Sequence, residues 1–330
     1  MRNAVANPAN IRTALKEGMS RLRAVGTPSH TLATELLLMH ALGRDRAWMY
    51  AHVEEPLADA ECEKFFALIA RRAAGEPTQY LTGKQEFWGR EFAVTPAVLI
   101  PRPETEHVME VALARLGERG IKIHMDTGVP RAKLRVADVG TGSGCLAVAL
   151  AWELPHADVY ATDISAPALE IAQRNAARHN VADRVHFSQC DLLAGLQDAN
   201  SRTVGARHAV PVVSAARVPG SAPPESLFDL IVSNPPYVAL EEARNLQREV
   251  RDHEPHQALF GGRTGVEIYG RLIEQARALL RDRGILVLEL GHDSAEYVRG
   301  IFDEQSGWTN ASITMDLAGI PRVLAAERVR

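Results

Sequence analysis

Four residues with distinctive chemistry, Asn234, Pro235, Pro236 and Tyr237, follow an apolar stretch that begins at Phe228. The apolar stretch predicts a buried strand, and two consecutive prolines end its pairing because they have no N–H donor. The strand therefore leads into a rigid corner that carries an amide and an aromatic ring. In open α/β sheets, ligands bind outside the carboxyl ends of the strands, so this corner is a candidate binding site.

A glycine-rich turn follows an earlier predicted strand in the segment VADVGTGSGCLAVAL, where Gly140, Gly142 and Gly144 alternate with other residues. Glycine permits a tight turn and lets backbone N–H groups approach a ligand at the N-terminus of a helix. The next predicted strand ends in Asp163, and an acid in this place commonly accepts hydrogen bonds from ribose hydroxyl groups. Together these features predict an adenosine-containing ligand. The alternative for the glycines is a strand-to-helix turn that binds no ligand. The alternative for Asp163 is a local turn residue beside Ser165.

Two residues after the third predicted strand, Asp191 and Leu192, are candidates for contact with an adenine ring. A leucine there would pack on the face of the base, whereas Asp191 can equally be a solvated acid. The glycine spacing differs from the Gly-x-Gly-x-x-Gly of NAD-binding sites. With Asp138 before it, Gly-x-Gly-x-Gly resembles the loop of class I S-adenosylmethionine-dependent methyltransferases. The resemblance implies S-adenosyl-L-methionine as the cofactor.

Residues 234–237 in turn resemble the Asn-Pro-Pro-Tyr signature of methyltransferases that act on a planar nitrogen, either adenine N6 or glutamine N5. The resemblance implies that the Asn234 side-chain oxygen and the Pro235 carbonyl accept hydrogen bonds from the substrate N–H groups. Such acceptors favour a pyramidal nitrogen whose lone pair points at the methyl group. The prolines hold the acceptors in place, and Tyr237 offers a flat face. Alignment then supplies much of the catalysis, and no metal is needed.

Four segments together resemble the release factor glutamine methyltransferases, the PrmC/HemK family: LTGKQEFWGREFAVTPAVLIPRPETE, DVGTGSG, SNPPYV and HEPHQALFGGRTGVEIY. That family methylates N5 of the glutamine in the Gly-Gly-Gln motif of class I peptide chain release factors. The resemblance implies the same reaction and partner, with Arg102 and Glu104 near the mouth of the crevice. The implied substrate contacts are Asn234, Pro235, Pro236 and Tyr237, and the catalytic residues among them are Asn234, Pro235 and Tyr237. The implied cofactor contacts are Gly140, Thr141, Gly142, Ser143, Gly144, Asp163, Asp191, Leu192 and Asn234.

Two features depart from that family. Leu192 stands where the family often has an aromatic residue, and residues 197–226 form an insertion for which we expect a flexible surface loop. Three other functions share parts of the pattern: ribosomal protein glutamine N5-methylation, nucleic-acid adenine N6-methylation, and binding without catalysis. The IPRPETE segment argues against the first, the acidic net charge against the second, and the intact residues 234–237 against the third.

The elements that position these residues are those of an α/β fold. Apolar stretches alternate with helical ones from about residue 134, which predicts a mostly parallel sheet covered on both faces. The predicted strands are LRVADVG, DVYATDI, RVHFSQCD, FDLIVSN and GILVLEL, with ASITMDLA and RVLAAERV as an antiparallel hairpin at the edge. The expected architecture is the Rossmann-like sheet of class I methyltransferases. GVEIYGRLIEQARALLRDR is expected to be one helix.

The residues before the sheet predict a small helical bundle and a hairpin. Apolar residues recur at helical spacing in TLATELLLMHALG, and Asp59 is the expected N-cap of a later helix. Around Gly89, residues 87–92 resemble a hairpin with a two-residue turn that Gly89 opens. We expect a helical substrate-recognition domain at 1–75, a hairpin linker at 76–98 and a methyltransferase domain at 99–330.

Composition limits the class of protein. Of the 330 residues 46% are hydrophobic and 24% charged, and the net charge is −4, so no direct nucleic-acid binding is expected. The three cysteines, Cys62, Cys145 and Cys190, form no Cys-x-x-Cys pair and favour a reducing cytoplasm. The sequence contains neither a signal peptide nor an apolar run that would span a membrane, so a cytoplasmic protein without membrane contact is expected.

Overall fold

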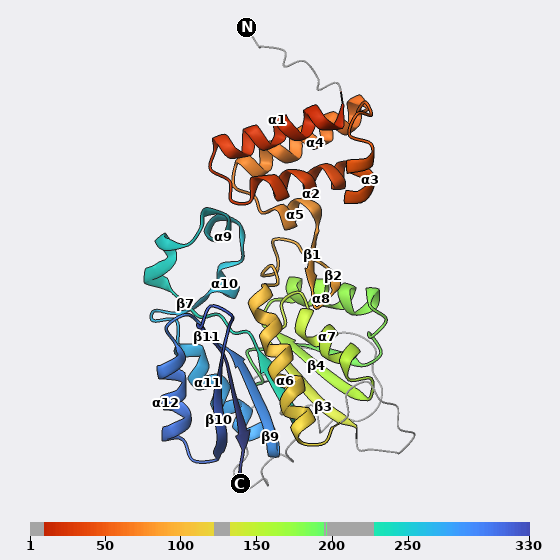
Figure 1. Ribbon diagram of the computed structural model, residues 1–330. Coiled ribbons are helices and arrows are strands. Elements are labelled where there is room, and N and C mark those ends of the chain that lie inside the picture. The colour runs from red at the N-terminus through yellow and green to blue at the C-terminus, as the bar shows by residue number, and fades with distance from the viewer. Residues whose placement is uncertain (1–9, 122–132, 195, 197–227) are drawn as a thin grey trace.

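The computed structural model describes residues 10–121, 133–194, 196 and 228–330, so the expected insertion at 197–226 lies outside the described residues. At one end of the molecule the chain forms a helical bundle (Figure 1). Its helices are α1 (Ile11–Ala24), α2 (His30–Leu42), α3 (Arg46–Ala51), α4 (Asp59–Ala73) and α5 (Thr78–Thr82). Leu22, Leu37 and Phe65 are fully buried where α1, α2 and α4 pack together. The predicted helical bundle is confirmed.

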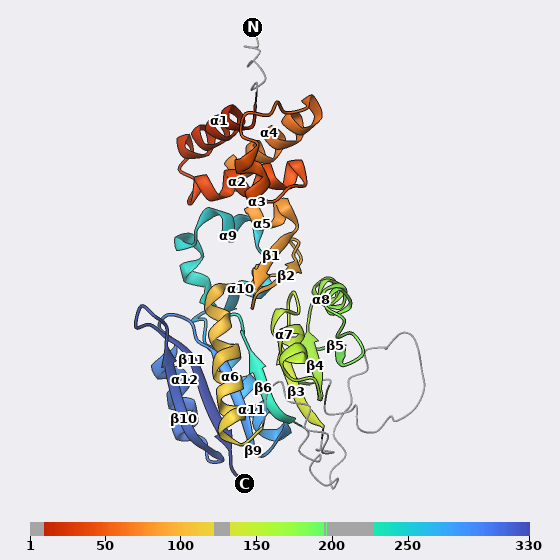
Figure 2. The same cartoon turned by 45° about the vertical axis from the view of Figure 1, so that its right-hand side comes forward.

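A hairpin leads from this bundle to the sheet (Figure 2). Its strands are β1 (Lys84–Phe87) and β2 (Arg90–Ala93), which pair antiparallel. Trp88 and Gly89 make the two-residue turn with φ angles of 52° and 65°. Such a turn requires a positive φ at both central residues, so Gly89 is its second residue and does not open it as expected.

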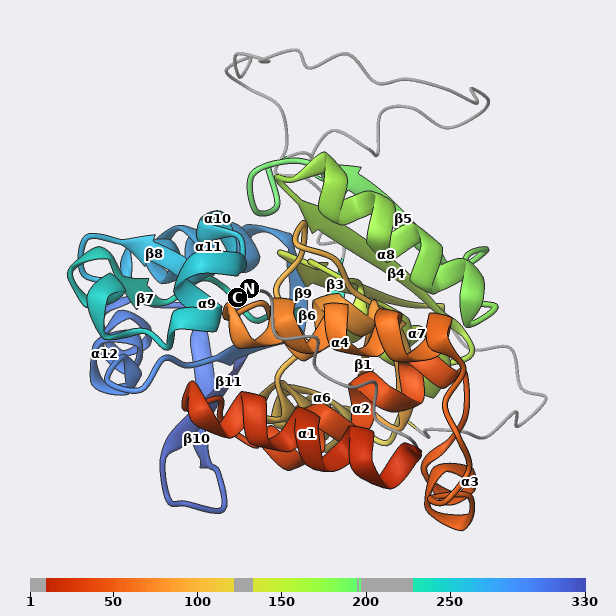
Figure 3. The same cartoon turned by 90° about the horizontal axis from the view of Figure 1, so that it is seen from above.

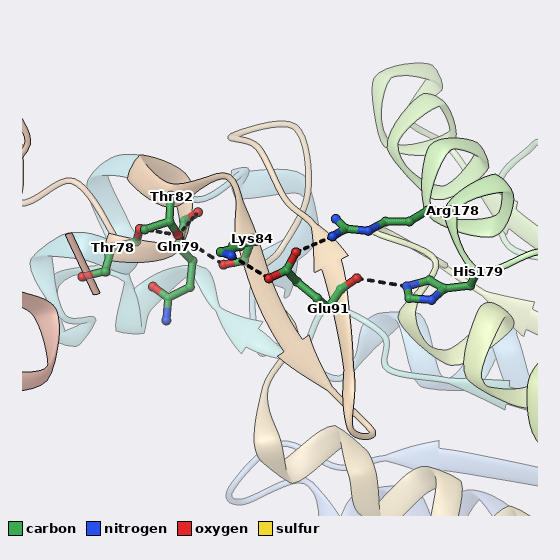
Figure 4. A network of polar contacts seen from close by, with 7 residues as sticks. All are labelled: Thr78, Gln79, Thr82, Lys84, Glu91, Arg178 and His179. Carbon is green, nitrogen blue, oxygen red and sulfur yellow. Dashed lines mark hydrogen bonds and ion pairs between the residues drawn. The ribbon is translucent and has the colours of Figure 1, made fainter. Parts of the chain in front are cut away.

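The hairpin is fixed to the sheet through Glu91, as Figure 4 shows. The Glu91 carboxylate forms ion pairs with Lys84 and with Arg178. Its backbone carbonyl accepts a hydrogen bond from the His179 ring at 3.0 Å. Arg178 ends α8 (Ala166–Arg178), so a helix that flanks the sheet holds the hairpin in place.

Seven strands form the main sheet in the order β10–β11–β9–β6–β3–β4–β5. The strands are β3 (Leu134–Val139), β4 (Ala157–Asp163), β5 (Val185–Gln189), β6 (Phe228–Ser233), β9 (Leu280–Glu289), β10 (Trp308–Met315) and β11 (Pro321–Arg328). The five strands from β9 to β5 are parallel, and β10 and β11 add the antiparallel hairpin at one edge. The predicted Rossmann-like sheet is confirmed.

Helices cover both faces of the sheet. On one face, α6 (Glu106–Glu118) and α7 (Cys145–Glu153) bury Val136 and the other strand side chains that point their way. On the other face, α11 (Glu267–Leu279) and α12 (Ala295–Glu304) bury Ala137 and its equivalents. Neighbouring strand residues thus enter different cores, as the alternation of side chains along a strand requires.

The chain between β6 and α11 lies over the carboxyl end of the sheet and meets the helical bundle. It contains β7 (Val238–Ala239), the 3-10 helix η3 (Leu240–Asn245), α9 (Arg248–His253), α10 (His256–Leu259) and β8 (Phe260–Gly262). From above, α9 lies at the end of α4 (Figure 3), where the guanidinium of Arg72 forms an ion pair with Glu249. Arg72 is 5% exposed, so a buried guanidinium joins the helical bundle to the segment that follows β6.

Two helix boundaries differ from the sequence-based expectation. Ala58 is the N-cap of α4, and its N–H donates to the Glu61 carboxylate at 3.0 Å, so Asp59 is the first helical residue. The helix α11 ends at Leu279, and Leu280 already pairs with Phe228 in the sheet. Because Leu280 is fully buried, sheet packing overrides the helical propensity of the segment. Among the described residues, no helix is long and apolar enough to cross a bilayer.

Candidate active site

The carboxyl ends of β4, β3 and β6 lie side by side at one edge of the sheet. The structure therefore places the loop of residues 140–144 between Asp163 and residues 234–237. The Ser233 hydroxyl donates to the Val139 carbonyl at 2.7 Å and joins the ends of β6 and β3. The three predicted groups meet at one edge, while the roles of their individual residues stay predictions.

Asp163 holds the glycine loop. The Gly142 N–H donates to its Oδ2 and the Ser165 N–H to its Oδ1, each at 2.9 Å. Burial raises the pKa of Asp163, and the two N–H groups oppose that rise. Each carboxylate oxygen has two lone pairs, so Asp163 is both the local turn residue and an available acceptor for hydroxyl groups. Ser165 also caps α8, since its hydroxyl accepts from the Ala168 N–H at 3.3 Å.

A second carboxylate, Asp138, lies beneath the same loop and is 1% exposed. Its Oδ2 accepts from the Thr141 hydroxyl at 2.6 Å and from the Ala147 N–H at 3.0 Å. Among the described residues, its Oδ1 has no hydrogen-bond partner. Burial raises the pKa of Asp138 to about 7. The Gly142 α-carbon, with a φ of 55°, borders open space, because a β-carbon there would meet nothing within 4 Å.

The two candidates after β5 differ in their surroundings. Asp191 is half-exposed and forms an ion pair with Arg271 of α11. Leu192 has a φ of 53° and packs against the core that contains Leu193 and the buried face of α11. Both follow β5, the strand next to β4. Their contact with an adenine ring stays a prediction.

At the corner after β6, the Asn234 amide nitrogen donates to the Thr105 hydroxyl at 2.9 Å. Thr105 precedes α6 and is 2% exposed, yet its side chain forms no capping bond with that helix. The backbone of Tyr237 is closely packed, because a β-carbon on Gly265 would lie 2.3 Å from its carbonyl oxygen. A β-carbon on Gly291 would lie 2.9 Å from the Tyr237 ring. Glycine, which has no β-carbon, leaves room for the Tyr237 backbone and ring at these two positions. The close packing strongly constrains the conformation of residues 234–237.

A cavity of about 570 Å³ opens beside this corner, a size typical of ligand sites. Its walls come from segments that are distant in sequence and include Arg102, Glu104, Asn234, Pro235, Pro236, Tyr237, Glu249 and Glu289. The expected position of Arg102 and Glu104 near the crevice thus agrees with the cavity wall. Among the described residues, no group of three His, Cys, Asp or Glu side chains is arranged to hold a metal ion.

The segment IPRPETE is anchored by Glu254, which is 4% exposed. The Glu254 carboxylate pairs with the Arg102 guanidinium at 2.5 Å and accepts from the Ile100 N–H at 3.3 Å. Burial raises the pKa of Glu254, while the charge of Arg102 opposes that rise. IPRPETE therefore contacts two other segments of the site, HEPHQ through Arg102 and residues 234–237 through Thr105.

Comparison with known proteins gives the family. Residues 13–83 match the PrmC N-terminal domain, and residues 120–205 match the methyltransferase small domain. A release factor glutamine methyltransferase of Koribacter versatilis is 42% identical over 96% of this chain and 98% of its own. One of Nitratidesulfovibrio vulgaris is 36% identical over 99% of this chain and 98% of its own.

The chain belongs to the release factor glutamine methyltransferase family. The resemblance stated from the sequence is thereby confirmed. A solved methyltransferase from Pyrococcus furiosus shares 18% identity over 79% of this chain and 98% of its own, with a TM-score of 0.45. The family assignment does not depend on that likeness.

Sequence reasoning missed two buried polar residues near the corner: Glu289, which lines the cavity, and Thr105, which binds Asn234. Glu289 is 1% exposed, and burial raises its pKa to about 7. The Tyr237 hydroxyl lies 3.4 Å from its Oε1. A signal was present in the sequence, since Glu289 interrupts the apolar strand LVLEL and a buried carboxylate is rare without a partner or a function. No comparable signal marked Thr105, because a threonine before a helix is an ordinary cap.

Proposed function

We propose that this protein transfers a methyl group from S-adenosyl-L-methionine to N5 of the glutamine side chain in the Gly-Gly-Gln motif of class I peptide chain release factors. The observation that carries the proposal is the orientation of Asn234 in the cavity wall. Its amide nitrogen is engaged by Thr105, so its amide oxygen remains as an acceptor for a substrate N–H. The names of the family members support the same reaction.

The residues at the edge of β3 and β4 fit the cofactor. Asp163 can accept hydrogen bonds from ribose hydroxyl groups, and the open side of Gly142 allows close approach of a ligand. Among the described residues, Oδ1 of the buried Asp138 has no hydrogen-bond partner. A cationic methionine part would favour the ionised form of this carboxyl, whose pKa burial raises to about 7. Thr141, Ser143 and Leu192 are further proposed contacts, and Asp191 is one through its place after β5. When bound, the cofactor supplies an activated methyl group.

The corner residues then align the glutamine amide. The Asn234 oxygen and the Pro235 carbonyl accept its two N–H bonds and favour a pyramidal nitrogen with its lone pair directed at the methyl carbon. The glycine contacts around Tyr237 hold these acceptors before the substrate arrives, and such preorganisation is a large part of catalysis. Tyr237 and Pro236 enclose the flat amide. The nitrogen loses its proton to solvent after transfer.

A protein substrate also requires contacts outside the cavity. We propose that the helical domain at 1–75 and the hairpin linker at 76–98 bind the release factor, while residues 99–330 carry the catalysis. The ion pair between Arg72 and Glu249 supports this proposal, because it joins the helical bundle to the cavity wall. A protein bound to the bundle would therefore lie near the cavity. A cytoplasmic location and the absence of direct nucleic-acid binding belong to the same proposal.

Mass spectrometry tests the reaction. The purified protein is incubated with cofactor carrying a labelled methyl group and with a full-length class I release factor. We expect one labelled methyl group on the glutamine of Gly-Gly-Gln. A release factor in which that glutamine is replaced by asparagine is the matched control and should remain unlabelled.

Two parallel substrates separate the alternatives. Ribosomal proteins with accessible glutamines and DNA or RNA oligonucleotides that contain adenine are incubated under the same conditions. Label on a ribosomal protein or on adenine, with none on the release factor, would refute the proposal. Label on the release factor alone would support it.

A further inference from the structure

A fully buried carboxamide, that of Asn175, lies between the glycine loop and the hairpin. Asn175 is on α8 and is 0% exposed. Its side-chain nitrogen donates to the Ser143 carbonyl at 2.8 Å and to the Ala93 carbonyl at 3.0 Å. Its side-chain oxygen accepts from the Ala93 N–H at 2.8 Å. Ala93 ends β2 and Ser143 lies in the loop of residues 140–144, so one side chain of α8 joins the hairpin to the glycine loop.

The three hydrogen bonds fix the orientation of this carboxamide. A carbonyl oxygen only accepts and a backbone N–H only donates, so the NH₂ group must face both carbonyls and the oxygen must face the Ala93 N–H. An ionised aspartate would have no donor here, and a serine or threonine hydroxyl would have one for two carbonyls. A glutamine would add a methylene group to a fully buried position. The contacts therefore require an asparagine.

Within the glycine loop, the Ser143 carbonyl is the group that Asn175 holds. Gly144 is the N-cap of α7, and its carbonyl accepts the Val148 N–H at 2.8 Å. The Ser143 carbonyl precedes this helical hydrogen bond. Ser143 stands between Gly142 and Gly144, whose φ angles are 55° and 80°, and glycine has more backbone freedom than any other residue. Asn175 thus restrains the stretch of backbone that would otherwise move most easily.

The packing of α8 against the loop agrees with this role. Ala172 lies three residues before Asn175 and therefore on the same side of the helix. A β-carbon on Gly144 would lie 3.0 Å from the Ala172 β-carbon. The helix and the loop are thus in direct contact beside the hydrogen bond.

The hairpin has anchors other than Asn175. The Trp88 N–H donates to the Glu106 carboxylate at 2.7 Å. Glu91 is held by the end of α8, as Figure 4 shows. The hairpin should therefore keep its place without Asn175, whereas the Ser143 carbonyl would lose the hydrogen bond that ties it to α8.

We infer that Asn175 is a positioning residue, which acts through the Ser143 carbonyl to hold the glycine loop in the conformation that binds S-adenosyl-L-methionine. This inference rests on the proposed function, which places the cofactor beside that loop. A loop without this restraint would have to be ordered when the cofactor binds. The entropy lost in that ordering would be subtracted from the binding free energy, so the affinity would fall.

Two substitutions of Asn175 and one control test the inference. Asn175→Asp keeps the volume and the acceptor but, when ionised, has no donor for either carbonyl. Asn175→Ala removes all three hydrogen bonds. The matched control is His179→Ala, at the residue that follows α8. The His179 ring donates to the Glu91 carbonyl at 3.0 Å and packs on Phe92. It thus holds the same hairpin, and among the described residues no hydrogen bond joins its ring to the glycine loop.

The first measurement needs no cofactor. Hydrogen–deuterium exchange is followed by mass spectrometry on peptides that contain residues 140–144. The Gly142 and Gly144 amides bond to Asp163 and to Thr141, so their exchange reports the order of the loop and not the loss of a direct bond to Asn175. We expect exchange about 10-fold faster in both Asn175 variants, as for the loss of roughly one hydrogen bond, and a wild-type rate in His179→Ala.

Three outcomes of this measurement would overturn the inference. The first is wild-type exchange in a folded Asn175 variant, and the second is equally fast exchange in His179→Ala. The third is rapid exchange of the loop in the wild type itself, because the loop would then not be held before the cofactor binds. This last outcome decides the matter even if neither Asn175 variant folds.

The second measurement is calorimetric titration with S-adenosyl-L-methionine. We expect Kd to rise about 10-fold in both Asn175 variants and to stay within about twofold of the wild type in His179→Ala. In steady-state transfer to the release factor, KM for the cofactor should rise likewise, while kcat at saturating cofactor should fall by less than about threefold. An unchanged Kd, or a loss that appears in kcat and not in KM, would overturn the inference. Failure of the wild type to bind the cofactor, with the expected exchange rates, would refute the proposed function and leave the hold of Asn175 on the loop established.

Discussion

Replacing Glu289 with glutamine should stabilise the fold at a pH above about 7. Burial raises the pKa of Glu289 from 4.5 to about 7, so the folded protein binds this proton more tightly than the unfolded chain does. Protonated Glu289 therefore makes its full contribution to the free energy of unfolding below pH 4.5. It is lost as the pH rises to about 7, because the carboxylate must then ionise inside the protein. The groups that face Glu289 and share this balance are Glu104, Tyr237 and Arg322.

The size of the effect follows from that pKa. A rise from 4.5 to about 7, at about 1.4 kcal/mol for each pH unit, corresponds to about 3 kcal/mol. This net cost already includes the favourable contacts that the ionised carboxylate makes, and glutamine avoids it because it stays neutral. We therefore expect Glu289→Gln to raise the free energy of unfolding by about 3 kcal/mol at pH 8. At pH 4.5 the gain should disappear.

Urea denaturation at pH 8 and at pH 4.5 measures this difference. Glu153→Gln serves as the control, because it is another buried glutamate that accepts a side-chain hydrogen bond. The reasoning about Glu289 would be refuted if Glu289→Gln were less stable than the wild type at pH 8, or if its gain were the same at both pH values. A gain in stability together with a loss of kcat would identify Glu289 as a residue retained for its function.

Three further predictions concern the rest of the site. Asn234→Ala should lower methyl transfer by about 100-fold or more, as for the loss of one preorganised hydrogen-bond partner, and leave cofactor affinity nearly intact; equal turnover would contradict the mechanism. Asp163→Ala should weaken S-adenosylmethionine binding by about 10-fold or more in calorimetry, and an unchanged affinity would exclude the ribose contact. Arg72→Ala should lower stability by about 1 to 3 kcal/mol and raise KM for the release factor, because it leaves Glu249 unpaired. The exposed ion pair of Arg12 with Glu54 is the control for Arg72→Ala, since Arg12→Ala should change stability by less than about 1 kcal/mol; equal effects of the two substitutions would contradict the role of Arg72.

The strands, their mostly parallel arrangement and the place of the polar residues at their ends could be predicted from the sequence. The strands that end in Asp163 and Ser233 are mostly apolar and are separated from their neighbours by helical stretches, and parallel strands bring their carboxyl ends to one edge. Local sequence patterns predicted the ends of the helices less accurately. The helix α11 was expected to continue to Arg283, but it ends at Leu279, because the burial of Leu280 in the sheet depends on tertiary packing.

The contacts beneath the corner could not be predicted, because each joins residues that are far apart in the chain. Thr105 precedes a helix and has the residue type of an ordinary N-cap, yet its hydroxyl binds Asn234. Arg102 carries a charge that any exposed loop tolerates, yet it neutralises Glu254 inside the protein. Pattern within a segment does not reveal such partners.

The position of IPRPETE explains why a segment outside the sheet is so distinctive in sequence. Pro101 and Pro103 restrict the backbone on either side of Arg102, so the segment reaches Glu254 and Asn234 with little freedom to lose. A flexible segment would have to be ordered for each contact, at a cost of about 1 kcal/mol or more for each residue fixed. The rigid segment thus holds the Thr105 hydroxyl against the Asn234 amide before substrate binds. The proposed substrate acceptor, the Asn234 side chain, is thus held in place by Thr105 of a segment outside the sheet.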